Sequence, residues 1–430
     1  MNKTSKILSV ILALQIIIAA FYSCDDAGVA PNEPVDPLAI TVNGKVLDNS
    51  GVPVNGAKVS IGTQMDTTDI NGFFTLENIS KPYDIKVLIS NENYGYLFQG
   101  LTTGSPQLST GPYSQTQYSC NLTTTIVPSL TGNERAFVIF TDQNEVQQSA
   151  LIIQPNQSVI MNVKWRGVSP VNGKLIVFIV NFLNGEVQSY EKYGERSISL
   201  NNGGNPQQTF QDNDLTLNPV DSTIQGTLSI PGGYSQAEAN FQINYKQGKA
   251  LIYPFSSGTT ISTVSGLSYN FVVPTGLPTQ FRYVLSCSAG GSNTFEFTSK
   301  SRVTTAGSSN NTVNLEAFST LLNPPNNQFN VNLSTSFDVN SGSGSGVLVY
   351  TFEGTDRTFQ VITTQSTATL PDLTSLGINI GANHNYDWSV AKYGSLTSIN
   401  QFTEASLFNN SSIFYFTSSA ERHFTTTGSP

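Results

Sequence analysis

Charged residues are scarce in this chain. They make up 11% of its 430 residues, against about 25% in an average soluble domain. Lys and Arg total 20 and Asp and Glu total 29, which gives a formal net charge of −9. Binding to nucleic acid depends on cations that displace counterions from phosphate, and the sequence contains no basic stripe that could do so. The same shortage argues against an electrostatic attachment to anionic lipid.

Histidine and cysteine are rarer still, with two and three residues. Hydrolysis by a nucleophilic Ser or Cys usually needs a base beside the nucleophile, and His384 and His423 stand in no catalytic motif; a Gly-x-Ser-x-Gly elbow is also missing. Zinc needs Cys and His at short spacings, and none occurs. We therefore predict two surface histidines and a protein that is not an enzyme, with no metal and no cofactor.

Calcium is harder to exclude, because its oxygen ligands can come from any loop rich in Asp and Asn. The best candidates are Asp338-Val-Asn-Ser-Gly342 and Asp212-Asn-Asp214, and both lack the closing Glu of an EF-hand loop. Asp and Asn also favour turns for conformational reasons. We expect these residues, together with Asp66 and Asp69, to serve turns, while calcium binding by a loop stays open.

The N-terminus has the pattern of an export signal. Lys3 and Lys6 precede an apolar run of 14 residues, from Ile7 to Ala20. Such a run lies within the 7–15 residues of a signal-peptide core and is too short to cross about 30 Å of hydrocarbon comfortably. The sequence therefore predicts a signal peptide over residues 1–23.

Ser23-Cys24 resembles the lipobox of bacterial lipoproteins, in which a small residue precedes a lipidated cysteine that becomes the mature N-terminus. Phe21 and Tyr22 depart from the usual Leu-Ala/Ser pattern. The resemblance implies a lipid on the thiol of Cys24, and several buried acyl chains at about 0.8 kcal/mol per CH₂ would make the membrane anchor stable. Simple secretion without a lipid is the alternative.

Residues 24–39 predict an extended tether, because Pro31, Pro34 and Pro37 interrupt a stretch with no apolar period. The acidic pair Asp25-Asp26 resembles the surface-export signal of some Gram-negative lineages, whereas in others an Asp at this place retains the protein at the inner membrane. We expect a lipid-anchored protein of the cell envelope at the outer membrane, with surface exposure left open.

From Ile40 onward the chain predicts an all-β fold of tandem β-sandwich domains. Short apolar runs recur between clusters of Gly, Asn, Pro and Ser at the spacing of strands and turns, and no convincing helical period is present. The run Leu175–Phe182 is almost entirely apolar, as expected of a strand buried on both faces. Cys120 and Cys287 lie in strand-like segments and are interpreted as small buried side chains, since two cysteines do not make a disulfide framework.

The first predicted domain, residues 40–125, contains Gly44-Lys-Val-Leu-Asp48, Gly51-Val-Pro-Val54, Gly56-Ala-Lys-Val-Ser-Ile61 and Thr68-Asp-Ile-Asn-Gly72-Phe-Phe-Thr-Leu76. Asn71-Gly72 between two apolar strands predicts a hairpin, because both residues tolerate positive φ. The whole stretch resembles the carboxypeptidase regulatory-like (transthyretin-like) domain. That resemblance implies a seven-stranded sandwich without catalytic residues, an accessory or spacer module found on outer-membrane receptors and surface lipoproteins.

Three further domains are predicted over residues 126–220, 221–318 and 319–430. The first two are interpreted as Ig-like, because the similar runs Asn213–Leu217 and Asn311–Leu315 lie 98 residues apart, close to the length of about 100 residues of an Ig-like sandwich. In the last, Tyr386–Lys392 alternates apolar and polar residues after Leu370–Leu373 and resembles the penultimate strand of a fibronectin type III domain. The usual early-strand tryptophan is missing, with Phe337 in about that position.

Aromatic residues leave one more possibility open. Tyr94-Gly-Tyr96-Leu-Phe98 and the pair Tyr190 and Tyr193 could stack on sugars, although such rings more often fill a core. The sequence thus predicts a non-catalytic, lipid-anchored envelope protein with a structural or adhesive role towards a protein or glycan. The alternative is a glycan-binding lipoprotein of an outer-membrane uptake system. Neither the ligand nor the oligomeric state is specified by the sequence.

Overall fold

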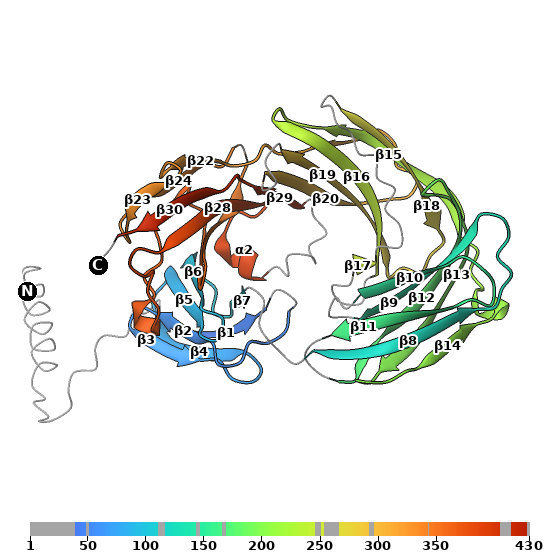
Figure 1. Cartoon of the computed structure of the whole chain (residues 1–430), viewed down its shortest axis with the longest axis horizontal. Helices are drawn as coiled ribbons and strands as arrows, with labels where there is room; N and C mark the ends of the chain where they lie inside the picture. Colours follow the sequence, from blue (N-terminus) through green and yellow to red (C-terminus); the bar gives the residue numbers. More distant parts are fainter. Residues whose placement is uncertain are drawn as a thin grey trace, which may run out of the picture. The chain divides into compact units, whose positions relative to one another are not determined.

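The computed structural model describes residues 39–48, 51–110, 117–142, 147–165, 169–245, 251–252, 266–291, 296–342, 344–404 and 414–427. These ranges consist almost wholly of β-strands that form several sheets (Figure 1), which confirms the predicted all-β fold of tandem sandwiches. The predicted signal peptide, Cys24 and the predicted tether up to residue 38 lie outside the described residues. No helix among the described residues combines the length and the apolar character needed to cross a bilayer.

The first sandwich packs a sheet of order β4-β1-β7 against strands of order β3-β2-β5-β6. Its core gathers the inward-facing side chains of both sheets, such as Val46, Phe74 and Leu108. The strands are β1 (Ile40–Leu47), β2 (Lys58–Ile61), β3 (Gln64–Thr67), β4 (Phe73–Ile79), β5 (Tyr83–Ile89), β6 (Tyr94–Leu101) and β7 (Gln107–Ser109).

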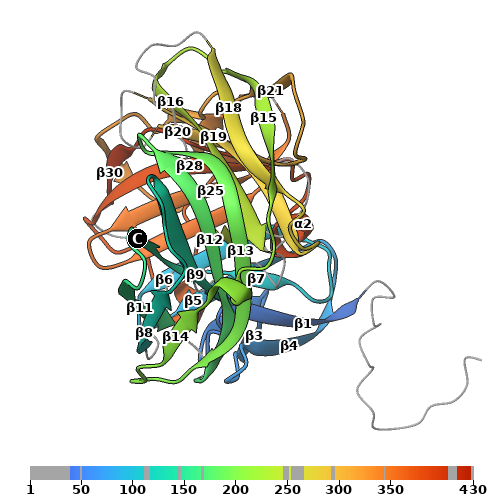
Figure 2. The same cartoon turned by 90° about the vertical axis from the view of Figure 1, so that its right-hand side faces the viewer.

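The second sandwich has sheets of order β11-β8-β14 and β10-β9-β12-β13, and the predicted domain boundary at residue 125 falls within β8. Figure 2 shows β12 and β13 as two long neighbouring strands. The strands are β8 (Tyr118–Ile126), β9 (Glu134–Asp142), β10 (Gln147–Ile152), β11 (Ser158–Trp165), β12 (Val171–Leu183), β13 (Glu186–Leu200) and β14 (Gln207–Phe210), followed by the short 3-10 helix η1 (Asp212–Asp214).

The third sandwich has sheets of order β18-β15-β21 and β17-β16-β19-β20. The strands are β15 (Val220–Ser229), β16 (Tyr234–Tyr245), β17 (Leu251–Ile252), β18 (Leu267–Thr275), β19 (Phe281–Gly291), β20 (Phe297–Thr304) and β21 (Asn311–Asn314).

The first three sandwiches share one connectivity. In each, the first strand lies between the fourth strand and the seventh, antiparallel to the former and parallel to the latter. The second strand lies in the opposite sheet, beside the third and the fifth. In an immunoglobulin domain the first two strands are neighbours in one sheet, so the two middle units are sandwiches of a different connectivity.

The predicted repeat matched residues 213–217 with residues 311–315, but these segments are not structural counterparts. The counterpart of β21 is β14, since each pairs in parallel with the first strand of its sandwich. Residues 213–217 instead contain part of η1 and a single bridge from Leu217 to Tyr193. The carboxylate of Asp214 accepts the backbone N–H of Gln211 and holds this segment in a turn. A similar run of residue types therefore did not mean a similar pairing.

The Asn71-Gly72 turn forms as predicted, but the hairpin prediction is wrong. Gly72 has φ +78°, and a Cβ there would lie 2.5 Å from the carbonyl oxygen of Val46. The strands on either side belong to different sheets, because β3 pairs with β2 and β4 pairs with β1. The carboxylate of Asp69 accepts the N–H groups of Asn71 and Phe73 and so fixes a corner between the two sheets.

The fourth sandwich places a sheet of order β22-β24-β27 against strands of order β26-β25-β28-β30, with β23 parallel to β30. It also contains η2 (Thr374–Leu376) and the short helix α2 (Ile399–Glu404). The strands are β22 (Thr320–Asn323), β23 (Gln328–Val331), β24 (Phe337–Asn340), β25 (Gly346–Gly354), β26 (Thr358–Thr363), β27 (Thr367–Ala368), β28 (Asn385–Gly394), β29 (Phe414–Ser418) and β30 (Arg422–Thr426).

The core of the fourth sandwich is built on the residues that the sequence singled out. Phe337 packs edge-on against Trp388, with 5.0 Å between the ring centroids, and both side chains are buried. Tyr386 precedes this tryptophan on β28, and its hydroxyl donates to the carbonyl of Ile380 at 2.6 Å. A tyrosine at the start of such a strand, bonded to the backbone a few residues upstream, is the tyrosine corner of Ig-type sandwiches.

Several strands are apolar on both faces because each face meets a different core. On β12, Leu175, Val177 and Ile179 pack in the second sandwich, whereas Phe178 and Val180 join a cluster shared with the third. The prediction that this strand is buried on both sides is confirmed. Strands of different sandwiches also pair with one another. β26 of the fourth sandwich pairs in parallel with β6 of the first, and β29 of the fourth pairs with β20 of the third. Strands of these three sandwiches therefore belong to one hydrogen-bonded sheet.

Replacing Leu175 by Ala should destabilise the second sandwich by about 2–5 kcal/mol, the usual cost of a cavity at a fully buried leucine. Trp165 belongs to the same core, so its fluorescence during unfolding in guanidinium chloride reports the loss. The control is Ile160→Ala on β11, a side chain that is 67% exposed, for which we expect a change within about 0.5 kcal/mol. Equal losses in the two variants would contradict the described core.

Candidate functional site

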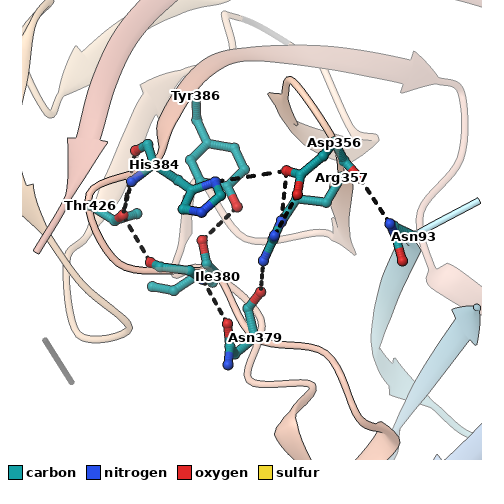
Figure 3. A network of polar contacts seen from close by, with 9 residues as sticks. Asn93, Asp356, Arg357, Asn379, Ile380, His384, Tyr386 and Thr426 are labelled. Carbon is teal, nitrogen blue, oxygen red and sulfur yellow. Dashed lines mark hydrogen bonds and ion pairs between the residues drawn. The ribbon is translucent and has the colours of Figure 1, made fainter. Parts of the chain in front are cut away.

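The predicted surface histidine His384 belongs to a polar network at one end of the fourth sandwich (Figure 3). We call Asn93, Asp356, Arg357, Asn379 and His384 the Asp356 cluster. Arg357 donates from Nε and Nη2 to the two carboxylate oxygens of Asp356, at 2.9 and 2.6 Å, and from Nη1 to the carbonyl of Asn379 at 2.9 Å. These hydrogen bonds from Arg357 lower the pKa of Asp356.

The ring of His384 lies beside this ion pair, with 3.7 Å between its Nδ1 and Oδ1 of Asp356, and its side chain is 38% exposed. The hydroxyl of Thr426, in the same network, accepts the backbone N–H of His384 and donates to the carbonyl of Gly381. The imidazole therefore has no nucleophile bonded to it among the described contacts. The cluster fixes the loop before β28 and carries the features of a structural site.

The second histidine, His423, is exposed and sits in an acidic row. Its Nδ1 contacts a carboxylate oxygen of Asp387, its cross-strand neighbour. Asp387 is in turn directly opposite Glu353 on β25. Burial raises the pKa of the nearby Glu421, and the charges of Asp387 and Glu353 raise it further. Among the described residues, no group of three or more His, Cys, Asp or Glu side chains is arranged to hold a metal ion.

Both candidate calcium segments have structural partners. The carboxylate of Asp338 accepts hydrogen bonds from Ser336, Asn323 and Thr367, which tie together the three strands of its sheet and lower its pKa. Asn340 accepts the N–H of Gly342 in a local turn. Such contacts are expected of Asp and Asn side chains that serve turns and strand ends.

The second candidate, Asp212-Asn-Asp214, is held by two ion pairs. Asp212 pairs with Lys192 and Asp214 pairs with Arg196, both at 2.5 Å. In the first sandwich Asp66 and Asp69 likewise accept backbone N–H groups of the β3–β4 turn, from Thr75 and from Asn71. All four carboxylates therefore act as turn or ion-pair partners.

The proposed sugar platforms are core residues. Tyr96 and Phe98 are buried in the first sandwich, and Tyr190 and Tyr193 are buried in the cluster shared by the second and third sandwiches, where Tyr193 packs edge-on against Phe281. The more frequent role of such rings, the filling of a core, is thus confirmed for these four. Tyr94 remains partly exposed.

Cys120 and Cys287 are buried and free, as predicted. Burial raises the pKa of Cys287 to about 12 and also raises that of Cys120. Thiols that stay protonated are poor nucleophiles. These two side chains therefore behave as small apolar core residues.

Lys392 is a buried cation that sequence reasoning missed. Its ammonium donates to the carbonyls of Ser341 and Gly344, at 2.9 and 2.8 Å, and lies over the ring of Tyr415. Burial lowers its pKa. The alternation of β28 already placed Lys392 on the same face as Trp388 and Val390, and a lysine on a core face is seldom buried without partners. The side chain holds the loop before β25.

An exposed apolar surface at the β3–β4 turn was also missed. Ile70, Met65 and Phe73 are 79%, 60% and 52% exposed. Ile70 stands on the turn that Asp69 fixes, and the ammonium of Lys45 lies 4.9 Å from the ring centroid of Phe73. Sequence reasoning expected a hairpin here and did not single out Ile70. An apolar residue at the tip of a tight turn has no core to pack against, and this is the signal that could have found the exposed surface. We call these three residues the turn surface.

The carboxyl of Glu421 should make stability depend on pH. Its pKa is raised in the folded protein, so its contribution is fully present below the unfolded value of about 4.3 and is lost as the pH rises through the folded pKa. Glu421→Gln should therefore raise the melting temperature of the fourth sandwich at pH 7 and leave it unchanged near pH 3.5. Glu77→Gln, on the exposed face of β4, is the control; no gain at pH 7, or the same gain at both pH values, would refute the effect.

No family model matches the chain, and no curated protein matches it. Among solved structures it is similar to the fimbrial anchor protein Mfa2 from Porphyromonas gingivalis, with 11% identity over 39% of this chain and 77% of that one and a TM-score of 0.17. It is also similar to a Ca²⁺-stabilized adhesin of an Antarctic bacterium, with 9% identity over 90% of this chain and 98% of that one and a TM-score of 0.16. Likenesses of this size carry no argument about function.

Proposed function

We propose that this chain is a non-catalytic, lipid-anchored protein of the bacterial cell envelope with a structural or adhesive role. The adhesive part of this proposal rests on the exposure of the turn surface. Loops on a rigid sandwich scaffold commonly hold binding residues, and here the carboxylate of Asp69 fixes a turn that presents Ile70 almost fully to solvent.

Anchoring is supported by the N-terminal sequence. The apolar run Ile7–Ala20 ends shortly before Ser23-Cys24, and a proline-containing tether follows. The first described strand begins at Ile40, so the tether separates the lipid from the sandwiches. With acidic residues directly after Cys24, the outer membrane is the proposed location.

A non-catalytic role is supported by the use that the fold makes of its polar groups. The residues that could have formed a site have structural partners. The ring of His384 lies beside Asp356, the carboxylate of Asp338 accepts the hydroxyl of Thr367, and Asp214 pairs with Arg196. The glycan-binding alternative is weakened, because four of the five rings proposed for it, Tyr96, Phe98, Tyr190 and Tyr193, are buried. Of the proposed rings, Tyr94 alone is partly exposed.

Lipidation is tested by expressing the full chain in a Gram-negative host fed an alkyne-bearing fatty acid. We expect the wild-type protein to take up the label and to sediment with membranes. The matched Cys24→Ser variant should remain unlabelled, because the thiol that receives the lipid is gone. A wild-type chain that is soluble and unlabelled after export would refute the anchor.

Adhesion is tested with cells that display the chain and settle on hydrophobic polystyrene or on cells of the same strain. Ile70→Asp should reduce attachment about tenfold, since a charge at the centre of an apolar contact costs at least about 1.4 kcal/mol. Ile160→Asp, the same change at an exposed isoleucine of the second sandwich, should leave attachment unaltered. Unchanged attachment of the Ile70 variant on both surfaces would remove the turn surface from the proposal.

A further inference from the structure

The edge strand of the first sandwich is paired with a strand of the fourth. β6 and β26 run parallel in continuous register, from Tyr94 opposite Thr358 to Phe98 opposite Ile362. At the start of this pairing the N–H of Thr358 donates to the carbonyl of Asn93, and the side-chain amide of Asn93 donates to the carbonyl of Asp356. The Asp356 cluster thus stands at the head of the pairing (Figure 3).

Each of the two sandwiches completes the core of the other across this joint. Leu97 on β6 and Leu88 on β5 belong to the first sandwich by sequence, but their side chains lie in the core of the fourth. In return, the core of the first sandwich contains side chains of the fourth, namely Val347, Val349, Ile362, Ile399 and Phe402. Neighbouring residues of one strand point to opposite faces, so the two cores lie on opposite faces of the joined sheet.

Polar contacts surround the same joint. The side chain of Asn400 on α2 accepts the N–H groups of Thr102 and Thr103 and donates to the hydroxyl of Thr102. The ammonium of Lys58 on β2 donates to the carbonyl of Leu376 in η2 at 3.0 Å. Interfaces between domains of one chain are usually small and rather polar, whereas this one has a backbone ladder and apolar side chains on both faces.

We propose that this joint is a clasp that makes the first and fourth sandwiches one cooperative folding unit, with the second and third sandwiches in the loop that it closes. The entropy lost on closing a loop grows only slowly with loop length, so the long intervening segment does not prevent the pairing. Opening the clasp would leave cavities in both cores and expose two sheet edges, and each of these changes is unfavourable. The inference is independent of the proposed function.

The two tryptophans of the chain allow a direct test. Trp165 lies in the second sandwich and Trp388 in the fourth, so Trp165→Phe leaves a single reporter for the fourth. In this background we introduce Leu108→Ala on β7, a fully buried residue of the first core on a strand that pairs with β1. The clasp predicts that unfolding in urea, followed by Trp388 fluorescence, becomes easier, with the unfolding constant raised about 30-fold or more. An unchanged Trp388 transition would overturn the proposal.

The matched control is Leu122→Ala, an equally buried residue of the second core. It should shift the Trp388 transition much less than Leu108→Ala does, because among the described residues the second sandwich is linked to the fourth through the third, while in a Trp388→Phe background it should lower the transition seen by Trp165. A shift of the Trp388 transition as large as that caused by Leu108→Ala would also overturn the proposal, because the first sandwich would then be no more strongly coupled to the fourth than the second is. Should Leu108→Ala fail to fold, Val46→Ala on β1 removes less volume from the same core and gives the same decision. Hydrogen exchange of the backbone amides of β1 and β28, measured by mass spectrometry, should increase together in Leu108→Ala or in Val46→Ala.

Discussion

The structure depends on strands that have no polar face. Tyr96-Leu-Phe98 on β6 and Val347–Tyr350 on β25 are buried on both sides, and water cannot cover either side without exposing apolar surface. Such strands need a core above and a core below, and the pairing of β6 with β26 supplies both. It also removes an unpaired sheet edge, which would otherwise offer a template for aggregation. The second and third sandwiches meet the same demand through β12, whose Phe178 packs near Phe281 of β19.

Charged side chains are few in this chain, and several of them fix corners and loops of the fold. Asp69 fixes the β3–β4 corner, Asp338 joins three strands, and Asp356 with Arg357 holds the loop before β28. These groups are engaged in bonds that define the fold. The contact surface that we favour is therefore apolar, and its most exposed member is Ile70.

Sequence reasoning succeeded where a signal was local. The strand at Leu175–Phe182, its burial on both faces, and the burial of Cys120 and Cys287 follow from apolar patterning and residue size. It failed at Asn71-Gly72, because positive φ specifies a turn but not which sheet the next strand joins. For the candidate site, sequence reasoning expected turn aspartates and two surface histidines, and it overlooked Lys392 and the exposed turn.

The sequence by itself determined the all-β class, the apolar runs and the turn at Asn71-Gly72, because these depend on the φ preferences and polarity of neighbouring residues. The export and lipidation expectation rests on the N-terminal sequence alone. Only the tertiary structure decided which strands pair, that three sandwiches share one connectivity, and that the first sandwich meets the fourth rather than standing alone. The physical reason is that the hydrogen-bonding groups of every strand edge are chemically alike. The strand that pairs with a given edge is selected by the side chains, distant in sequence, that pack on the two faces of the sheet. A local stretch of sequence does not contain these side chains.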